Sequence, residues 1–429
     1  MRAVGCVRVP QLTIAASLAS TRDVPRQHGQ WIVCQLGARE NYAVGRALAG
    51  SGRLAALITD AWHTPGSLAA RFSDRLRDRF HPELAAERIE APGYVHIASE
   101  CRERCFGPGG WRSINNRNIR FEDMAARRLR ALARAGVSCS TVFAYSYAAG
   151  AIFRVARELG LRTVLGQIDP GPVEDEIVGD LYRKAGQSSR WERIPQDYWA
   201  RWREEVELSD TIVANSRWSK ALLVRGGVPI EKIVVVPLAY DRITSTVQAN
   251  RAPLPVGWTA ERPLRMLFLG QVTLRKGIGP LLSAIARMPS APLRLDIVGP
   301  LQIELPDVSR NDPRIRVHGS VPRSAVHQHY EQADLFVFPT ISDGFGLTQL
   351  EALAHGLPVL TSSACGEVIE HDVNGFVLEG VTAEAIERIL RELLEEPGRL
   401  QAWTDRAAIP RGFSKADLAE NLFRIGGSK

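Results

Sequence analysis

Short apolar runs alternate with amphipathic segments along the first half of the chain. Residues 31–36 form an apolar run before Gly37, residues 38–51 place apolar side chains at helical spacing, and residues 54–59 form the next apolar run. A strand, a turn, a helix and a second strand leave no room for a hairpin, so this unit predicts parallel strands covered by helices. Further strands are predicted at 141–144, 162–167 and 211–214.

A second series of the same kind begins near residue 262. It predicts strands at 265–269, 293–298, 315–318, 335–338 and 358–361, and helices at 278–288, 326–332, 347–355 and 383–395. Residues 241–261 contain prolines and little periodicity, which is typical of a linker. We therefore expect two doubly wound α/β domains, at 29–240 and 262–410, whose strands end at a shared cleft.

The two ends of the chain do not fit either series. Residues 1–28 contain Pro10 and a weak apolar run at 12–19. Together they make a poor signal peptide, and the segment is interpreted as a loose leader. Residues 411–429 predict an amphipathic helix that crosses back onto the first domain. The longest weakly polar stretch, 137–153, is shorter than the ~20 apolar residues of a membrane-spanning helix.

The composition of the 429 residues, 45% hydrophobic and 24% charged, is that of a globular protein. Residues 1–250 carry 35 Lys and Arg against 26 Asp and Glu, whereas residues 251–429 carry 19 against 21. This asymmetry favours an anionic partner on the first half, namely a membrane surface, a phosphorylated substrate or nucleic acid; a generally Arg-rich proteome is the alternative. The six cysteines lack paired spacing, which favours a reducing compartment and predicts neither disulfides nor a metal site.

The segment from Asp343 to Glu351 is the most informative for function. Gly344 and Gly346 let the backbone approach a ligand closely, and a helix predicted to start near Leu347 points unpaired N–H groups towards it. A diphosphate fits this geometry. Glu351, one helical turn further on, can accept hydrogen bonds from vicinal hydroxyls such as those of a ribose. The alternative is a tight glycine loop with a capping aspartate.

The segment that opens the second series also suits phosphate. A strand ends at Gly270, and the following loop places Arg275 and Lys276 next to Gly277. Lysine offers a compact point charge and arginine a bidentate fork for phosphate oxygens. The alternative is that this Arg-Lys pair lies on a solvent-exposed surface. The presence of two loops suited to bind phosphate on one predicted sheet argues against this alternative.

These segments together resemble the retaining nucleotide-sugar glycosyltransferases of the GT-B fold, known as family 4 or glycosyl transferases group 1. The resemblance covers about residues 213–375. It rests on Asn215-Ser216, Pro237 to Asp241, Lys276-Gly277, the acidic pair around Gly-Phe-Gly, Leu350-Glu351-Ala352, Gly356 to Val359, Gly366 and Asn374 to Phe376. It implies two Rossmann-like domains facing a central cleft.

The resemblance also implies roles for individual residues. Lys276 would neutralise the donor diphosphate, Glu351 would hold the ribose, and Asp343 takes the place of a family glutamate near the transferred sugar. Beyond the resemblance, we expect Arg275 to supply the charge of a family arginine that this chain lacks. Donor contacts are expected from Gly270, Gln271, Gly344, Phe345, Gly346, Leu347 and Thr348. The chain has Gln271 where the family usually has arginine.

The first domain is expected to bind the acceptor. Gly37 follows the first strand, Asp169 follows a later one, and Tyr145 or Tyr147 replaces a histidine that the family often places after a central strand. The acids at 174–176 are interpreted as acceptor contacts or as a solvated helix start. Residues 68–80 carry apolar side chains four apart with arginines between, which indicates a helix on an anionic membrane or one packed on its own core.

The predicted function is transfer of a sugar from a nucleotide-diphosphate sugar to a glycan or lipid-linked acceptor, with retention, in bacterial cell-surface polysaccharide or glycoconjugate synthesis. No cofactor or metal is expected, because the cations do the neutralising and no Asp-x-Asp cluster is present. The expected location is cytoplasmic, with a peripheral position on the inner face of the membrane as one option. A catalytically silent sugar-nucleotide or glycan-binding relative, and another GT-B enzyme such as an epimerase, are the alternatives. Nucleic acid is not an expected partner, because the cations are not interleaved with aromatic residues.

Overall fold

The structure, a computed structural model, describes residues 29–67, 79–92, 109–240, 251 and 253–426. Several features predicted from the sequence lie outside these residues. They are the leader at 1–28, most of the amphipathic stripe at 68–80, three of the cysteines (Cys6, Cys101 and Cys105) and the linker residues 241–250 and 252.

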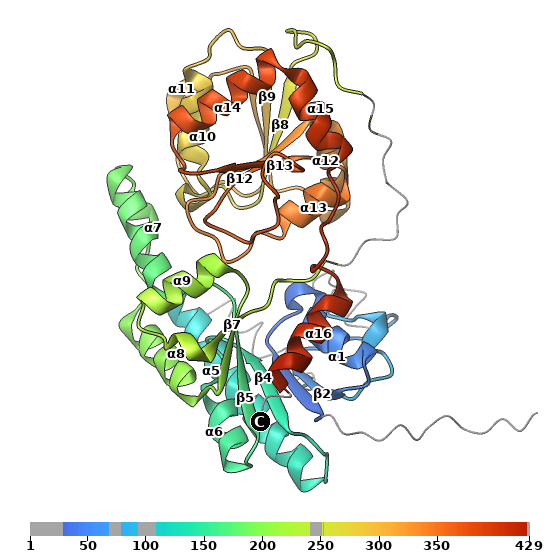
Figure 1. The fold of residues 1–429 in the computed structure, drawn as a ribbon. Helices are drawn as coiled ribbons and strands as arrows, with labels where there is room; N and C mark the ends of the chain where they lie inside the picture. The colour runs from blue at the N-terminus through green and yellow to red at the C-terminus, as the bar shows by residue number, and fades with distance from the viewer. Residues whose placement is uncertain (1–28, 68–78, 93–108, 241–250, 252, 427–429) are drawn as a thin grey trace, which may run out of the picture.

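The first domain is a seven-stranded parallel sheet with helices on both faces (Figure 1). The strand order is β3-β2-β1-β4-β5-β6-β7. The strands are β1 (Trp31–Gln35), β2 (Leu54–Thr59), β3 (Ile89–Glu90), β4 (Thr141–Tyr145), β5 (Arg162–Gln167), β6 (Thr211–Ala214) and β7 (Ile233–Val235). The helices are α1 (Ala43–Gly50), α5 (Gly110–Arg134), α6 (Gly150–Glu158), α7 (Pro172–Lys184), α8 (Gln196–Leu208) and α9 (Arg217–Arg225).

The second domain is a six-stranded parallel sheet in the order β10-β9-β8-β11-β12-β13. Its strands are β8 (Leu264–Leu269), β9 (Leu293–Val298), β10 (Ile315–Gly319), β11 (Leu335–Phe338), β12 (Val359–Ser362) and β13 (Gly375–Leu378). Its helices are α10 (Ile278–Ala286), α11 (Asp307–Arg310), α12 (Val326–Gln332), α13 (Thr348–Ala354), α14 (Ala383–Glu395) and α15 (Pro397–Asp405). The strand order reverses at β1/β4 in one sheet and at β8/β11 in the other, and ligands of such sheets bind beside these switch points.

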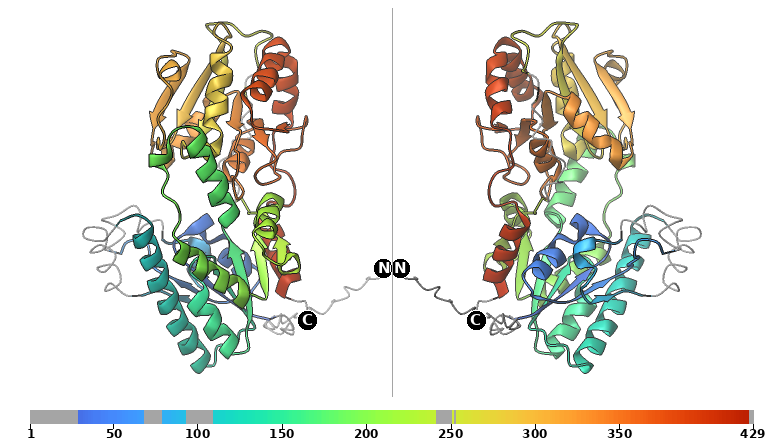
Figure 2. Two further views of the ribbon diagram at one scale, coloured as in Figure 1. Left: turned by 90° about the vertical axis from the view of Figure 1, so that its left-hand side faces the viewer. Right: turned by 90° about the vertical axis from the view of Figure 1, so that its right-hand side faces the viewer.

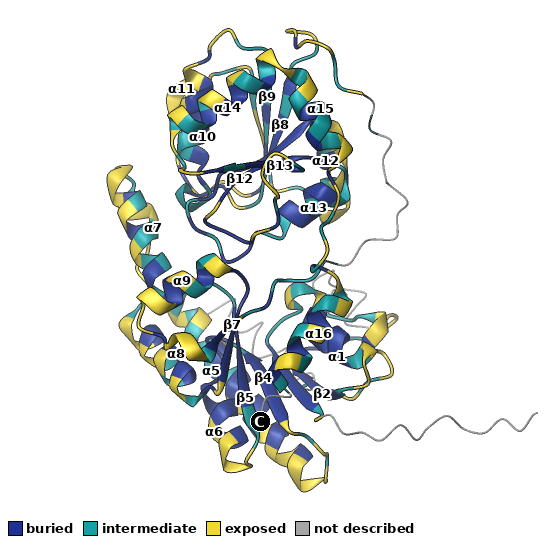
Figure 3. Cartoon of the chain, viewed as in Figure 1, coloured by how far each residue is buried: buried dark blue, intermediate teal, exposed yellow. Residues whose placement is uncertain are grey.

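Alternating side chains along the strands build one apolar core on each face of each sheet. Along β4, Val142 and Ala144 face α5 and α6, whereas Phe143 faces the side of α1. The same alternation runs along β11, where Val337 and Phe336 belong to opposite cores. Buried strands and exposed outer helix surfaces are visible in Figure 3.

Two segments join the domains. The C-terminal helix α16 (Lys415–Gly426) crosses to the first domain, where Leu418 and Leu422 lie buried in the core beside α1. Helix α7 extends the other way, from the first domain towards the second, as both views of Figure 2 show. Its Tyr182 is buried in the core of the second domain.

Several boundaries differ from those predicted, and two of the differences have a clear physical reason. The helix expected from residue 38 begins at Ala43, because Glu40, Asn41 and Tyr42 adopt left-handed backbone angles with φ of 51°, 50° and 60°. The second domain's packing also starts inside the predicted linker, where Trp258 is buried and its Nε1 donates to the Leu393 carbonyl at 3.0 Å.

Candidate functional site

A cleft of about 550 Å³ lies where the two sheets face each other across the domain interface. The second domain contributes the ends of β8 and β11, and the first domain contributes the ends of β1, β5 and β6. The predicted site residues that line it are Gly270, Lys276, Asp343, Phe345, Gly346, Leu347 and Thr348, and the first domain adds Leu36, Arg39, Glu40, Ile168, Asn215 and Leu238. The structure therefore brings the two phosphate-suited loops to one cavity.

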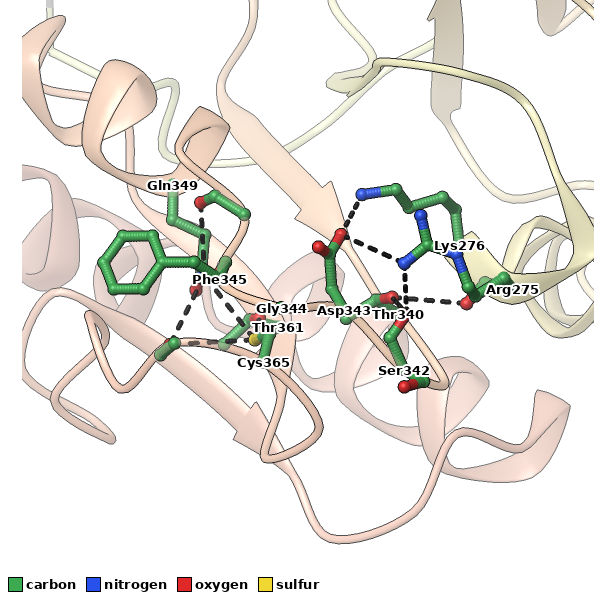
Figure 4. A network of polar contacts seen from close by, with 12 residues as sticks. Arg275, Lys276, Thr340, Ser342, Asp343, Gly344, Phe345, Gln349, Thr361 and Cys365 are labelled. Carbon is green, nitrogen blue, oxygen red and sulfur yellow. Dashed lines mark hydrogen bonds and ion pairs between the residues drawn. The ribbon is translucent and has the colours of Figure 1, made fainter. Parts of the chain in front are cut away.

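Lys276 and Asp343, both from the second domain, contact each other in this cleft. The Lys276 ammonium donates to Asp343 Oδ2, and the Arg275 guanidinium lies 3.7 Å from the same oxygen (Figure 4). Burial acts to raise the pKa of Asp343, but the two cations outweigh it and hold the pKa below its usual value. Asp343 is therefore an anion near neutral pH, and it pairs with Lys276.

The turn that carries these cations depends on one glycine. Arg275 and Lys276 lie in a single 3₁₀ turn, Leu274–Lys276, and Gly277 follows with φ of +73°. A Cβ atom at Gly277 would lie 1.7 Å from the carbonyl oxygen of Pro339, just after β11. Only glycine permits both this backbone angle and this approach. The close contact fixes the cation-bearing turn against the loop that carries Asp343.

The loop after β11 is held by side chains from its own domain. The Gln349 amide donates to the Phe345 carbonyl at 3.0 Å, and Gly346 adopts φ of +80° with its Cα packed against the Phe338 ring. Helix α13 starts at Thr348, so the backbone of residues 346–348 borders the cleft ahead of it. These contacts fix the loop within its own domain.

Four residues predicted on the donor side lie apart from the cleft lining, namely Gly344, Gln271, Arg275 and Glu351. Glu351 projects from α13, and its Oε2 accepts a hydrogen bond from the Tyr330 hydroxyl at 2.8 Å. Gln271 is exposed after β8. Arg275 lies behind Lys276 and donates to the Ser342 carbonyl at 2.6 Å.

The first domain binds this loop directly. The Ser216 and Ser219 hydroxyls, at the start of α9, both donate to the Gly344 carbonyl, at 2.6 and 3.2 Å. The Trp218 indole N–H donates to Ser342 Oγ at 3.0 Å. These bonds connect the loop after β11 to the first domain.

Glu174 makes a further contact between the two domains. It accepts a hydrogen bond from Ser342 Oγ at 2.7 Å and lies 3.5 Å from the Arg275 guanidinium. Of the acids at 174–176, it is Glu174 whose carboxylate reaches the second domain, and its side chain is 14% exposed. The sequence predicts that these acids lie at the start of a helix, but its spacing does not indicate that the helix extends to the other domain.

Glu174 gives a testable pH dependence. Burial raises the pKa of Glu174 to about 7 even though Arg275 acts to lower it. The unfolded chain loses this proton near pH 4.5 and the folded chain near pH 7, so this group's contribution to the free energy of unfolding falls as pH rises between these values. We expect the free energy of unfolding of wild type to fall by about 3 kcal/mol relative to that of Glu174→Gln over this range. Urea unfolding at about pH 5 and about pH 7.5 measures the change. Glu176→Gln, an exposed neighbour, is the control, and identical pH profiles for wild type and Glu174→Gln would refute the expectation.

The residues predicted to contact the acceptor lie at the carboxyl ends of β1, β4 and β5. The Gly37 N–H donates to Asp60 Oδ1 at 2.8 Å, and the Tyr145 hydroxyl donates to Glu40 at 3.2 Å. The Tyr147 hydroxyl donates to Asp169 at 2.5 Å. Gly37 thus contacts its own domain through Asp60, whereas Tyr145 lines a pocket that adjoins the cleft.

A family model described as glycosyl transferases group 1 matches residues 263–396. These residues are therefore similar in sequence to glycosyltransferase group 1 domains. The domain contains β8 to β13, and with them Lys276, Asp343 and Glu351.

Two relatives are similar in sequence to part of the chain. The D-inositol 3-phosphate glycosyltransferase of Xylanimonas cellulosilytica is 32% identical over 217 residues, which cover 45% of this chain and 51% of that protein. The sucrose synthase of Melioribacter roseus is 40% identical over 90 residues, or 20% of this chain and 11% of that protein. The chain therefore spans about half the length of the inositol phosphate glycosyltransferase and much less of the sucrose synthase.

Solved structures resemble both domains together. HepE of Anabaena, in complex with UDP, has a TM-score of 0.58 at 15% identity and covers 92% of this chain and 99% of its own. WaaG, a glycosyltransferase involved in lipopolysaccharide biosynthesis, has a TM-score of 0.57 at 17% identity, with 93% and 100% covered. These likenesses show that the two Rossmann-like domains have the GT-B fold, as the sequence resemblance implied.

Proposed function

We propose that this protein transfers a sugar from a nucleotide-diphosphate sugar to a glycan or lipid-linked acceptor, with retention at the anomeric carbon. The observation that carries the proposal is the meeting of Lys276 and Asp343, from two different loops, in a cleft at the switch point of a glycosyltransferase group 1 domain. HepE has been solved with UDP and with UDP-glucose, which makes uridine diphosphate sugars the first donors to test.

In this proposal the diphosphate displaces Asp343 from Lys276. The ammonium then stabilises the negative charge that develops on the leaving phosphate, and the Asp343 carboxylate becomes free to accept hydrogen bonds from the sugar hydroxyls. Arg275 stays behind Lys276 and adds positive potential without touching the ligand. Glu351, oriented by Tyr330, holds the ribose hydroxyls with its second oxygen.

The proposed reaction is a same-face displacement. The bond between the anomeric carbon and the phosphate oxygen breaks, the acceptor oxygen bonds to that carbon, and the acceptor proton passes to the leaving phosphate. The two domains enclose the reacting groups and exclude water from the activated sugar. Incubation with a panel of nucleotide sugars, followed by NMR of the product anomer, tests the proposal. Release of the nucleoside diphosphate with an inverted product would overturn retention, and a panel that yields no transfer would overturn the activity.

We propose that no metal takes part, because Lys276 and Arg275 already supply positive charge beside the position proposed for the diphosphate. In the ranges that the structure describes, no group of three His, Cys, Asp or Glu side chains could hold an ion. Transfer activity should therefore be unchanged within error after treatment with EDTA. Loss of activity that Mg²⁺ or Mn²⁺ restores would contradict metal independence.

We propose a cytoplasmic location, with a membrane-facing first domain if the acceptor is lipid-linked. No helix of residues 29–67, 79–92, 109–240 and 253–426 is long and apolar enough to cross a membrane. The basic excess of the first half supports the attraction to anionic lipid. At the edge of the amphipathic stripe, however, Arg79 pairs with Asp60 at 2.9 Å and belongs to the fold rather than to a membrane face.

A further inference from the structure

One segment of the first domain packs as part of the second (Figure 2). Residues 172–191, which we call the arm, contain α7 and the turn Ser188–Arg190, and in the chain they lie between β5 and α8 of the first domain. Tyr182 of the arm is 5% exposed and belongs to the core of the second domain, where Val178 and Trp191 pack beside it. The first domain therefore contributes a packed element to the second.

The far end of the arm is bound to the loop after β9. The Gln187 amide donates to the Glu304 carbonyl at 3.3 Å, and the Glu304 N–H donates to Gln187 Oε1 at 3.2 Å. Arg190 forms an ion pair with the Glu304 carboxylate. Gly179 leaves room for Trp191 to pack on α7, since a Cβ atom there would lie 2.6 Å from the indole ring. The arm is thus docked along its length.

The arm also contacts the turn that carries Arg275 and Lys276. Helix α7 packs against this turn, and Leu274, its first residue, lies against the same core as Tyr182. Burial raises the pKa of Tyr182, whereas the Leu274 backbone and then the Arg275 guanidinium act to lower it, so the phenol hydroxyl lies close to both residues. At the start of α7, the Glu174 carboxylate lies 3.5 Å from the Arg275 guanidinium. The arm therefore contacts the turn at two places.

The cleft and the arm lie against different residues of the turn. Lys276 lines the cleft, whereas no residue of the arm is among the described residues that line it. The second domain itself holds the turn near its end, where the Ile341 N–H donates to the Arg275 carbonyl at 2.8 Å and the Phe338 ring centre lies 4.8 Å from the Lys276 ammonium. The arm adds support at the start of the turn, where Tyr182 and Leu274 share one core. Tyr182 is thus placed to act on Lys276 without touching a ligand in the cleft.

We propose that Tyr182 is a positioning residue for the donor diphosphate, because it holds the turn so that the Lys276 ammonium projects into the cleft. The domain proposed to bind the acceptor thereby sets the position of a cation in the donor site. Tyr182 lies outside residues 263–396, so the part of the chain that is similar to group 1 domains does not contain this support. The inference rests on the proposed function, because it concerns the same diphosphate.

Calorimetric titration of wild type and Tyr182→Ala tests the proposal, with UDP, GDP and ADP and with their nucleosides. Tyr182→Ala should weaken binding of the preferred diphosphate by about tenfold, because a displaced ammonium loses much of a charged hydrogen bond. Its affinity for the nucleoside should be unchanged, since Lys276 is proposed to contact the diphosphate alone. Tyr182→Phe keeps a ring in the core and should bind the diphosphate more tightly than Tyr182→Ala. Asp180→Ala, which removes an exposed partner of Arg183 on the same helix, is the matched control and should bind as wild type does.

A double-mutant cycle with Lys276→Ala separates positioning from a general effect on the fold. If Tyr182 acts through Lys276, Tyr182→Ala should have little further effect on diphosphate affinity once residue 276 is alanine. An equal loss in both backgrounds, or wild-type affinity in Tyr182→Ala, would overturn the proposal. Circular dichroism checks the folding of each variant. Tyr182→Leu, which keeps an apolar side chain in the core, replaces Tyr182→Ala if that variant does not fold.

The same titrations distinguish failure of this proposal from failure of the proposed function. If wild type prefers a diphosphate to its nucleoside through Lys276, but the Tyr182 variants bind it equally well, the positioning role is wrong and the proposed function stands. If wild type binds no diphosphate more tightly than its nucleoside, both are wrong.

Discussion

Replacement of Lys276 by alanine is expected to lower kcat/KM for sugar transfer by about 10²–10³-fold. The ammonium lies in the cleft on a turn fixed by Gly277, and in the proposed reaction it stabilises charge on the leaving phosphate once Asp343 is displaced. Its loss also leaves Asp343 as a carboxylate with a more distant cation, Arg275, at 3.7 Å. Steady-state kinetics with a fixed acceptor and varied nucleotide sugar measure the effect.

Two further variants make this test specific. Lys276→Arg keeps the charge but changes its shape and should lose less than the alanine variant. Arg287→Ala removes an exposed cation of the same domain that pairs with Glu384, and its activity should match wild type. Wild-type activity in Lys276→Ala would remove Lys276 from the diphosphate site.

Replacement of Gly277 by alanine is expected to lower kcat/KM by about 10²-fold although no ligand contact is deleted. A methyl group at this position would meet the Pro339 carbonyl at 1.7 Å, so the turn or the loop after β11 must move. Displacement of catalytic groups by about 1 Å can cost about 10²-fold in rate. The expected signature is weaker nucleoside diphosphate binding together with slower transfer.

Gly279→Ala is the matched control for this variant. Gly279 lies two residues further along, inside α10, and a methyl group there meets no atom within 4 Å. Alanine also favours helix over glycine by up to about 1 kcal/mol, so Gly279→Ala should retain activity and unfold at an equal or higher temperature. Equal activity in the two alanine variants would show that the approach of Gly277 to Pro339 does not position the cations.

Much of the second domain could be predicted from its hydrophobic pattern. The strands at 293–298 and 335–338 and the helix at 383–395 are confirmed with the predicted bounds. Buried parallel strands are short apolar runs between turns, and helix α14 has a strong apolar stripe, so both signals are local. The meeting of Lys276 and Asp343 in one cleft follows from the position of both loops after neighbouring strands of that sheet.

The contacts between domains could not be predicted in this way. Glu174 and Ser216 form bonds with the other domain that depend on how the two sheets are oriented, and no local pattern encodes that orientation. The left-handed turn at 40–42 contains no glycine, so its sequence looks like the first turn of a helix. Helix α5 is absent from the predicted elements, although its buried residues Phe121, Met124, Ala125, Leu129 and Leu132 recur at helical spacing.

Binding of a nucleoside diphosphate at Lys276 can be measured by calorimetric titration of wild-type protein with UDP, GDP and ADP, each paired with its nucleoside. We expect at least one diphosphate to bind at least about tenfold more tightly than its nucleoside, and Lys276→Ala to remove most of this difference, since a charged hydrogen bond contributes about 1.5–3 kcal/mol. Equal affinity for diphosphates and nucleosides, or a difference that Lys276→Ala leaves intact, would contradict this expectation.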